Sequence, residues 1–323
     1  MLGQACTVSG PPATGVRVAY DEAPASLREW VDDALGSPVV SAITQPGGFS
    51  PGVAARLRCA DGTPAFCKAV SADVNDFAGA AHRREQRITV ALPAEAPVPR
   101  LLASYDDGTW VALLLQDLDA RQPAVPWRTD ELSRVIAALD DLGRLLTPSP
   151  VLDAPTLADA EGDGLEGWRN LAAGAQDPAG LDPWTQRNLD RLATLEPRWE
   201  PATEGDTLLH LDLRADNLLM AADRVWIVDW PSACTGKAWV DIATLAPSVA
   251  MQGGPRPSEL IASSVIGRSA DRDGLTAWVC ALASFFVSQS LQPAPAGLPT
   301  VRAFQAAQGI VALEWLRELT GWR

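Results

Sequence analysis

Apolar positions in the first third of the chain alternate or cluster in short runs, and this pattern predicts a sheet with helices. A short amphipathic helix is expected from Ser26, as its N-cap, to about Gly36. Helical spacing also predicts a helix over residues 76–92, whereas residues 1–25 are rich in small residues and are expected to be loosely structured. Short apolar runs bounded by turn residues predict five strands, at residues 39–44, 53–59, 65–70, 101–105 and 110–116.

Beyond residue 117 the apolar spacing becomes that of helices, expected at 131–146, 184–195, from 239 onward, 275–289 and 301–319. The segment Leu275–Val287 is strongly apolar, but it is shorter than a bilayer span, so we expect a buried core helix. The pattern therefore predicts an α+β protein of two lobes. Residues 1–117 would hold a five-stranded antiparallel sheet with a helix, and residues 118–323 would be mainly helical.

Composition narrows the classes of partner. Apolar residues make up 47% of the 323 and charged residues 20%, which excludes wholesale disorder. The formal net charge of −14 argues against nucleic acid or an anionic membrane as a partner, because binding to phosphate backbones relies on basic surface. A cationic small-molecule partner would suit this charge, although acidity also serves solubility. The oligomeric state is not predicted.

The cysteines and the start of the chain indicate a cytoplasmic protein. Five widely spaced cysteines include no Cys-x2-Cys pair, so neither a disulfide framework nor a zinc site is expected. Only two histidines are present, which makes zinc hydrolysis an improbable chemistry. The first residues have neither a basic start nor an apolar core, so no signal peptide is predicted.

The most informative stretch is a polar loop between two short apolar runs, residues 207–209 and 225–228, which we interpret as a hairpin-like pair of strands. The loop holds a carboxylate, Asp212, and an amide, Asn217, and the second run ends at another carboxylate, Asp229. Phosphoryl transfer uses such a set: one carboxylate accepts the proton of the attacking hydroxyl, and the other two groups hold Mg²⁺ against phosphates. Asp and Asn are also common in ordinary loops, so these residues alone could simply form turns. The upstream sequence decides between an ordinary loop and a phosphoryl-transfer site.

Two upstream features fit a nucleotide site. Gly47 and Gly48 lie between two predicted strands; they could form an ordinary wide hairpin loop, or a loop that lies close over a nucleotide. The loop is neither a Walker A loop nor a Rossmann turn. Lys68 lies within an apolar strand, where an unpaired ammonium would be costly to bury. Its natural partner is Glu85 on the following helix. The alternative for Lys68 is a lysine on an edge strand that faces solvent, and the alternative for Glu85 is an ordinary acidic residue on the surface.

An acidic stretch follows the first long helix of the second lobe. Five carboxylates occur between residues 153 and 166 before the first basic residue, Arg169. Such a run is usually a solvated face, and the alternative is an acidic lip for a cationic substrate.

The chain has a family resemblance, which is carried by four features: HLDLRADN at residues 210–217, IVDW at residues 227–230, Lys68 and Glu85. From about Val39 to Leu245 it resembles the aminoglycoside phosphotransferase and choline-kinase-like group within the protein-kinase-like fold. The resemblance implies that Lys68 contacts the α- and β-phosphates of ATP and that Glu85 orients it. It also implies that Asp212 is the catalytic base and that Asn217 and Asp229 bind Mg²⁺.

The same resemblance places the adenine against the backbone of Gln116, Asp117 and Leu118, and it makes His210 and Asp241 supports of the catalytic loop. Two departures occur: Leu211 stands where many relatives have Gly, and Trp230-Pro231 replaces the Phe-Gly of protein kinases. No Ala-Pro-Glu segment follows, which disfavours protein phosphorylation.

The expected activity is an ATP- and Mg²⁺-dependent transfer of phosphate to a hydroxyl of a small molecule. One candidate acceptor is an aminoglycoside-type antibiotic. The alternatives are a small metabolite such as choline, homoserine, a sugar or a fructosamine, and a catalytically silent nucleotide-binding module. The motifs describe the phosphate end of the reaction, so they leave the acceptor open.

Overall fold

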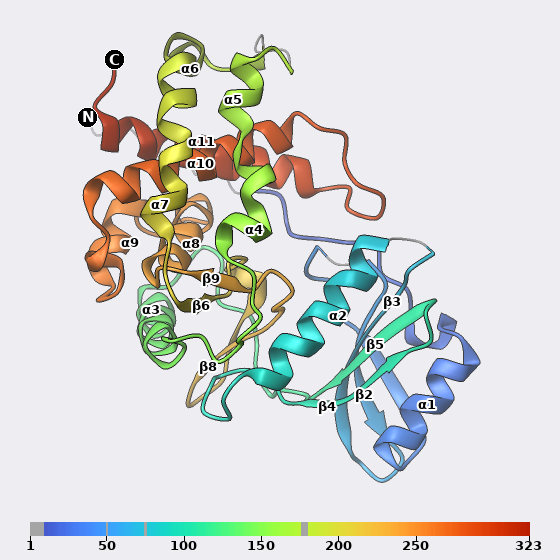
Figure 1. The fold of residues 1–323 in the computed structure, drawn as a ribbon. Helices are drawn as coiled ribbons and strands as arrows, with labels where there is room; N and C mark the ends of the chain where they lie inside the picture. Colours follow the sequence, from blue (N-terminus) through green and yellow to red (C-terminus); the bar gives the residue numbers. More distant parts are fainter. Residues whose placement is uncertain (1–9, 50, 74–75, 176–179) are drawn as a thin grey trace.

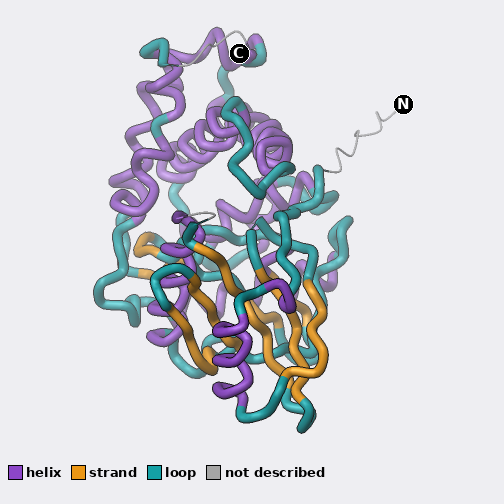
Figure 2. Tube along the Cα trace, turned by 90° about the vertical axis from the view of Figure 1, so that its right-hand side faces the viewer, coloured by secondary structure: helices purple, strands orange, loops and turns teal. Residues whose placement is uncertain are grey.

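A computed structural model describes residues 10–49, 51–73, 76–175 and 180–323. Figure 1 shows a sheet with flanking helices at one end of the molecule and a larger helical part at the other. Figure 2, turned by a quarter, shows the helices of the larger part gathered on one side of the strands. The α+β arrangement predicted from the apolar pattern is confirmed.

The five-stranded sheet is antiparallel and has the order β1-β2-β3-β5-β4. Its strands are β1 Val39–Thr44, β2 Val53–Cys59, β3 Pro64–Ser71, β4 Leu101–Asp106 and β5 Trp110–Leu115. Helix α1 (Ala25–Leu35) contributes Leu27 and Val31 to the core that includes Cys67 and Ala69. Side chains alternate between the two faces of a strand, so Lys68 points to the other face, where α2 (Asp76–Ala91) lies.

Helix α1 begins two residues earlier than the sequence predicts. Its N-cap is Pro24, and no side chain caps it, so the prediction of Ser26 as the N-cap is wrong. The helix ends as expected at Gly36, which has a φ of 72°. This left-handed backbone suits glycine, because glycine lacks the Cβ that would clash there.

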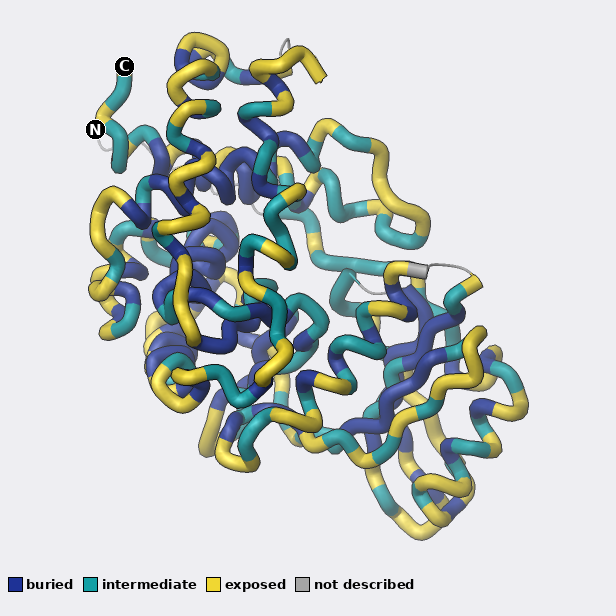
Figure 3. Tube along the Cα trace, in the orientation of Figure 1, coloured by how far each residue is buried: buried dark blue, intermediate teal, exposed yellow. Residues whose placement is uncertain are grey.

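The larger part is built mainly from helices. They are α3 Thr129–Leu145, α4 Leu157–Glu161, α5 Gly167–Ala172, α6 Pro183–Leu195, α7 Trp199–Thr203, α8 Trp239–Met251, α9 Pro257–Ser263, α10 Arg272–Ser290 and α11 Val301–Thr320. Figure 3 shows α8 and α10 as largely buried, which confirms the prediction of a core helix near residues 275–289. None of the helices in the described residues is long and apolar enough to cross a bilayer.

Four short strands lie between α7 and α8, and their pairing differs from the prediction. They are β6 Thr207–Leu209, β7 Leu218–Met220, β8 Val225–Ile227 and β9 Cys234–Gly236. Strand β6 pairs with β9, and β7 pairs with β8. The predicted pairing of residues 207–209 with 225–228 is therefore wrong. The polar loop instead leaves one two-stranded ladder and enters the other, which places its ends on two separate supports.

Residues 10–25 are more ordered than their composition predicts, whereas residues 1–9 lie outside the described part. Thr14 bridges to Gly47 and Gly48 in the loop between β1 and β2. Val16 donates a backbone hydrogen bond of 2.8 Å to the carbonyl of Gly297, just before α11. The Thr14 hydroxyl also lies 3.2 Å from the Thr300 hydroxyl. This segment, residues 10–19, thus connects the glycine-containing loop to the start of α11, and we call it the N-terminal strap.

The cysteines behave as the sequence predicts. Cys59, Cys67, Cys234 and Cys280 are buried free thiols, and Cys6 lies outside the described residues.

Candidate active site

Lys68 is held between two carboxylates that come from different parts of the chain. Its Nζ donates to Glu85 Oε1 at 2.7 Å and to Asp229 Oδ1 at 2.8 Å. The Lys68 side chain is 14% exposed and that of Glu85 4%. The predicted pairing of Lys68 with Glu85 is confirmed, and the solvent-facing alternatives are wrong. Residues 68, 85 and 229 therefore form a single charged cluster that joins β3, α2 and the end of the β8 segment.

The pKa values of this cluster follow from burial and mutual attraction. Burial acts to lower the Lys68 pKa, but the fields of Asp229 and Glu85 outweigh it and raise that pKa overall. Burial raises the pKa of Glu85 despite the nearby ammonium. For Asp229 burial is opposed by Lys68, and the net effect is a lowered pKa. The ammonium therefore stays charged at neutral pH and is available to an anionic ligand.

The loop that carries Asp212 is fixed by Asp241 and His210. Asp241, in the first turn of α8, accepts the backbone N–H of His210 at Oδ2 and of Leu211 at Oδ1, both at 2.8 Å. The imidazole of His210 donates from Nε2 to the Val228 carbonyl at 2.9 Å and accepts the Asp212 N–H at Nδ1. Through these contacts His210 and Asp241, which the resemblance makes supports of the loop, bind its backbone directly.

Asp212 has a partner for each carboxylate oxygen. Arg214 Nη1 donates to Oδ1, and Asn217 Nδ2 lies 3.2 Å from Oδ2 and 2.8 Å from the Asp212 carbonyl. Arg214 also donates from Nη2 to Asp216 at 2.9 Å, so two carboxylates share its charge. Burial raises the pKa of Asp212 to about 6, even though Arg214 acts against this rise. Near neutral pH the group is largely ionised and can accept a proton.

A cavity of about 450 Å³ lies between the sheet and the helical part. Lys68, Glu85, Asn217 and Asp229 line it together with apolar side chains that include Val98 and Leu219. Its volume lies in the range of small-molecule and cofactor sites, about 300–1,000 Å³. The structure thus brings the predicted phosphate-end residues to one cavity.

The predicted glycine loop borders this cavity. Gly47 and Gly48 line it, which favours the reading as a loop over a ligand rather than an ordinary wide hairpin. Gly48 has a φ of 90°, a backbone conformation that residues other than glycine rarely adopt. The loop is held by the N-terminal strap, in which Arg17 donates to the carbonyls of Gln45, at 3.1 Å, and Gly47.

Gln116, Asp117 and Leu118 form the cavity edge just beyond β5. The Gln116 N–H donates to the Arg100 carbonyl at 2.8 Å, and the Leu118 carbonyl accepts both Arg56 and the Ala120 N–H. The Gln116 carbonyl and the Leu118 N–H have no partner in the described part of the chain. The Asp117 carboxylate is occupied by a two-point contact with Arg56, at 2.7 and 2.9 Å. One backbone acceptor and one backbone donor at this edge of the cavity are thus open to a ligand.

A second, smaller pocket of about 180 Å³ lies on the other side of Asp212, and we call it the inner pocket. Asp212 and Arg214 line it, whereas Asn217 and Asp229 line the larger cavity. Since Asn217 contacts Asp212 directly, the two spaces meet at this pair. Of the acidic stretch at 153–166, only Glu161 lines the inner pocket among the described residues.

Asn217 and Asp229 fit a magnesium ion by their donor atoms. The Asn217 amide nitrogen is used by Asp212, which leaves its oxygen free, and Asp229 keeps Oδ2 free beside the Oδ1 that Lys68 contacts. No group of three His, Cys, Asp or Glu able to hold a metal is found among the described residues. The two oxygens of Asn217 and Asp229 are of the kind that Mg²⁺ takes, since this ion commonly binds one or two protein oxygens and completes its shell with water and phosphate.

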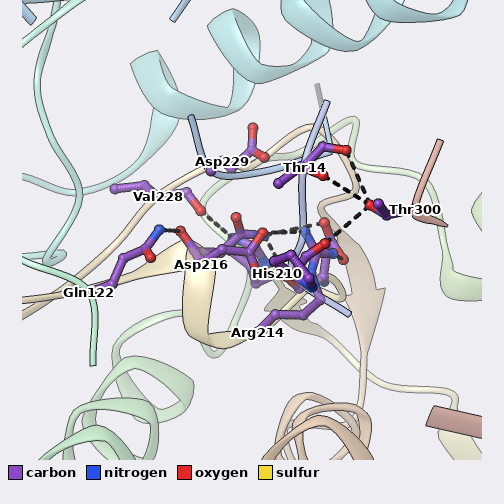
Figure 4. Close-up of polar contacts among 12 residues, drawn as sticks. Thr14, Gln122, His210, Arg214, Asp216, Val228, Asp229 and Thr300 are labelled. Atoms are coloured by element: carbon purple, nitrogen blue, oxygen red, sulfur yellow. Dashed lines mark hydrogen bonds and ion pairs between the residues drawn. The ribbon is translucent and has the colours of Figure 1, made fainter. Parts of the chain in front are cut away.

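Three residues of these sites were missed by the sequence reasoning. Arg214 lies within the motif at two residues from Asp212, and that spacing was the available signal. Arg17 and Phe49 gave no signal, because each lies in a Gly/Pro-rich segment. Figure 4 shows Arg214, Asp216 and His210 close together, with the Thr14–Thr300 contact beside them. Phe49 lies in the glycine loop yet lines the inner pocket, where its ring is 5.2 Å from that of Phe304.

Comparisons with known proteins agree with this geometry. The profile of the phosphotransferase enzyme family matches residues 64–278. A search of curated proteins found no match. Among solved structures, an aminoglycoside-3'-phosphotransferase of type VIII is 22% identical with a TM-score of 0.51, and the match covers 80% of this chain and 97% of that one.

Two further solved structures share the fold at lower identity. Choline kinase LicA from Streptococcus pneumoniae is 12% identical with a TM-score of 0.57, over 89% of this chain and 98% of that one. A thermostable mutant of an aminoglycoside phosphotransferase, in ternary complex with AMP-PNP and hygromycin B, is 13% identical with a TM-score of 0.56. That match covers 90% of this chain and 98% of the other.

Proposed function

The chain belongs to the phosphotransferase enzyme family and is a small-molecule kinase, and we propose that it transfers the γ-phosphate of ATP to a hydroxyl with the help of Mg²⁺. One observation carries this proposal. Asp212 and Asn217 contact each other at the meeting point of two spaces, one lined by Lys68 and Asp229 and the other by apolar side chains. A nucleotide in the first and an alcohol in the second would meet at Asp212.

The larger cavity supplies what a nucleotide requires. The free Gln116 carbonyl and Leu118 N–H would pair with the adenine, and the apolar walls would cover its faces. Lys68, oriented by Glu85, would neutralise phosphate oxygens, while Gly47 and Gly48 allow the loop backbone to lie close above them. A bound Mg²⁺ would be held by Asn217 and Asp229, and it supplies charge to offset that developing on the phosphates.

Asp212 would act as the general base. Its oxygens are oriented by Arg214 and Asn217, and it borders the inner pocket, where the acceptor hydroxyl would lie. The carboxylate takes the hydroxyl proton as the oxygen attacks phosphorus, and the bond to the leaving ADP oxygen breaks. Most of the rate would come from positioning and electrostatics. Among acceptors, the relatives suggest two classes: aminoglycoside-type antibiotics and small metabolites such as choline.

The direct test measures ADP release with ATP, Mg²⁺ and a panel of hydroxylated small molecules. We expect turnover with at least one acceptor and a nucleotide-dependent rise in thermal stability that requires Mg²⁺. Absence of turnover with every acceptor, together with nucleotide binding that Mg²⁺ does not affect, would contradict the proposal.

A further inference from the structure

The inner pocket is walled mainly by apolar and aromatic side chains. Its walls include Leu211, Leu282, Phe285, Phe286, Phe304 and Trp278. Phe285 and Phe286 contact each other edge to face at 5.6 Å, and Phe304 packs in the same way on Phe49. Such walls bind apolar surface by releasing water, and they offer few partners to a heavily hydrated ligand.

Several polar groups of residues that line this pocket lack a hydrogen-bond partner among the described residues, and the buried indole N–H of Trp278 is one of them. Gln308 on α11 is 4% exposed, and neither its amide nor the Glu161 carboxylate has a hydrogen-bond partner in the described parts of the chain. Burial raises the pKa of Glu161, and the charge of Asp212 adds to this rise, while Arg84, which does not line the pocket, acts against it. Buried polar groups normally have partners, so unpaired ones in an apolar pocket point to a ligand with matching groups.

The charges of the pocket leave room for a single cation. Arg214 is matched by Asp212 and Asp216, so Glu161 is the carboxylate without an ionic partner among the described lining residues. The other acids of its stretch are used elsewhere or face solvent: Asp159 accepts the Thr156 hydroxyl, Glu166 pairs with Arg169, and Asp163 is exposed. The acidic lip considered from the sequence is therefore reduced to one carboxylate.

The volume of the pocket limits the part of an acceptor that can lie inside it. About 180 Å³ is below the usual range of about 300–1,000 Å³ for sites that hold drug-sized ligands. Leu211 contributes to this by occupying the wall directly beside Asp212. A polycation of several sugar rings would not fit inside, and its additional ammonium groups would lie against aromatic walls without carboxylates.

Resting on the proposed kinase function, we infer that the acceptor is a compact, largely apolar alcohol of about one ring that carries at most one positive charge. Its body lies against the aromatic walls, and one donor group next to the reacting hydroxyl binds Glu161. A single ammonium is compatible with the pocket, because Glu161 supplies its counter-charge. Gln308 would bind a second polar group of the acceptor.

The inference can be tested with acceptors of matched shape. Trans-2-aminocyclohexanol and cyclohexane-1,2-diol share a ring and a hydroxyl and differ in charge, and kanamycin represents the polycations. With ATP and Mg²⁺, we expect kcat/KM for both ring alcohols to exceed that for kanamycin by at least tenfold. A preference for kanamycin, or no turnover of either ring alcohol while MgATP still raises the Tm, overturns the acceptor class.

Two variants test the role of Glu161. In Glu161→Gln the amide oxygen still accepts from a hydroxyl but has lost its charge, so kcat/KM should fall at least tenfold for the amino alcohol and less than threefold for the diol. Asp163→Asn, an exposed carboxylate of the same stretch, should change neither value. Equal effects of the two variants overturn the assignment of Glu161.

The readouts separate this inference from the function it rests on. A thermal shift with MgATP alone reports the nucleotide site and does not depend on the acceptor. If MgATP gives no shift and no acceptor is turned over, the proposed function fails and the acceptor inference fails with it. If the shift persists and kanamycin is preferred, the kinase function stands and only the acceptor inference is wrong.

Discussion

Arg214 donates to Oδ1 of Asp212, so this carboxylate has its counter-ion two residues further along the same loop. The guanidinium is buried and also contacts Asp216 at 2.9 Å, which fixes its plane. Asn217 holds the other oxygen of Asp212 at 3.2 Å. The carboxylate is thus oriented from both sides, and Arg214 lowers a pKa that burial alone would raise further.

The first prediction concerns pH. Asp212 must be ionised to accept a proton, so kcat/KM should be high above its pKa of about 6 and should fall as the pH drops through that value. Arg214→Gln removes the attraction that favours the ionised form, so the acid limb should move to higher pH. The measurement is the pH profile of kcat/KM for both proteins.

Arg144→Gln serves as the control for this shift, since Arg144 is an exposed residue of α3 that pairs with Asp141. It should leave the acid limb in place. If Arg214→Gln lowers activity equally at all pH values, then Arg214 acts on the structure of the loop and not on the ionisation of Asp212.

The second prediction separates chemistry from binding. Asp212→Asn removes the proton acceptor while keeping the shape of the side chain, so kcat should fall by about 10²–10⁴-fold. Because Asp212 lines the inner pocket and not the larger cavity, affinity for MgATP should be nearly unchanged in a binding titration. Asp223→Asn, an exposed carboxylate in the turn between β7 and β8, should preserve kcat. Activity of the Asp212 variant near that of the wild type would show that Asp212 is not the base.

The third prediction concerns the buried lysine. Lys68→Met leaves Glu85 with its charge buried and unpaired, which should lower the free energy of unfolding by about 3–5 kcal/mol. The double variant Lys68→Met/Glu85→Gln removes that charge and should recover part of the loss. Chemical denaturation of the three proteins gives the comparison.

The pH dependence of the lysine variants gives a second check. Burial already raises the Glu85 pKa in the native protein, and loss of the ammonium raises it further. In the Lys68→Met variant, Glu85 therefore binds its proton more tightly in the folded protein than in the unfolded protein. The single variant should gain stability as the pH falls through the folded-state pKa and lose it as the pH rises. Both variants also lose the contact of Lys68 with Asp229, and only the double variant lacks the contribution of Glu85. An equally steep trend in both would therefore contradict the assignment to Glu85.

The fourth prediction concerns Leu211, which has a φ of 63°. A left-handed backbone is strained for residues with a Cβ, and the loop is held in it by the contact of the Leu211 N–H with Asp241. Both Ala and Gly remove the leucine contacts, but only Gly relieves the strain. Leu211→Gly should therefore be more stable than Leu211→Ala by about 1 kcal/mol.

Leu213 provides the matched pair of variants in the same loop, because it is buried and does not have a positive φ. There Leu213→Ala should be the more stable of the two, since glycine costs more backbone entropy. If the Ala variant is more stable than the Gly variant at both positions 211 and 213, the strain at Leu211 does not affect stability.

Much of the sheet and its lysine could be predicted from the sequence, because strand alternation is a local property. Apolar neighbours around Lys68 indicated a buried strand, and the need for a counter-ion indicated Glu85. The pairing of β6 with β9 could not be predicted in this way. Strands of three residues carry too little pattern to specify a partner, so tertiary packing decides it.

The inner pocket was beyond sequence reasoning for a different reason. Glu161, Leu211, Phe286 and Gln308 come from four separate elements, and no spacing along the chain connects them. A motif can include only residues that are close in sequence. The motifs of this chain, at residues 210–217 and 227–230, contain few of the residues that line the inner pocket. The order of the N-terminal strap was also missed, because backbone hydrogen bonds to glycines leave no trace in side-chain composition.

The N-terminal strap has a consequence for the order of biosynthesis. The Val16 N–H of the strap donates to the Gly297 carbonyl. The strap that holds the glycine loop is therefore attached to a residue that is synthesised much later than the strap itself. The roughly 280 residues between them take about 15–60 s to translate. During that interval the glycine loop, which borders the larger cavity, lacks its second attachment. The final shape of the glycine loop is therefore set only after Gly297 has been synthesised.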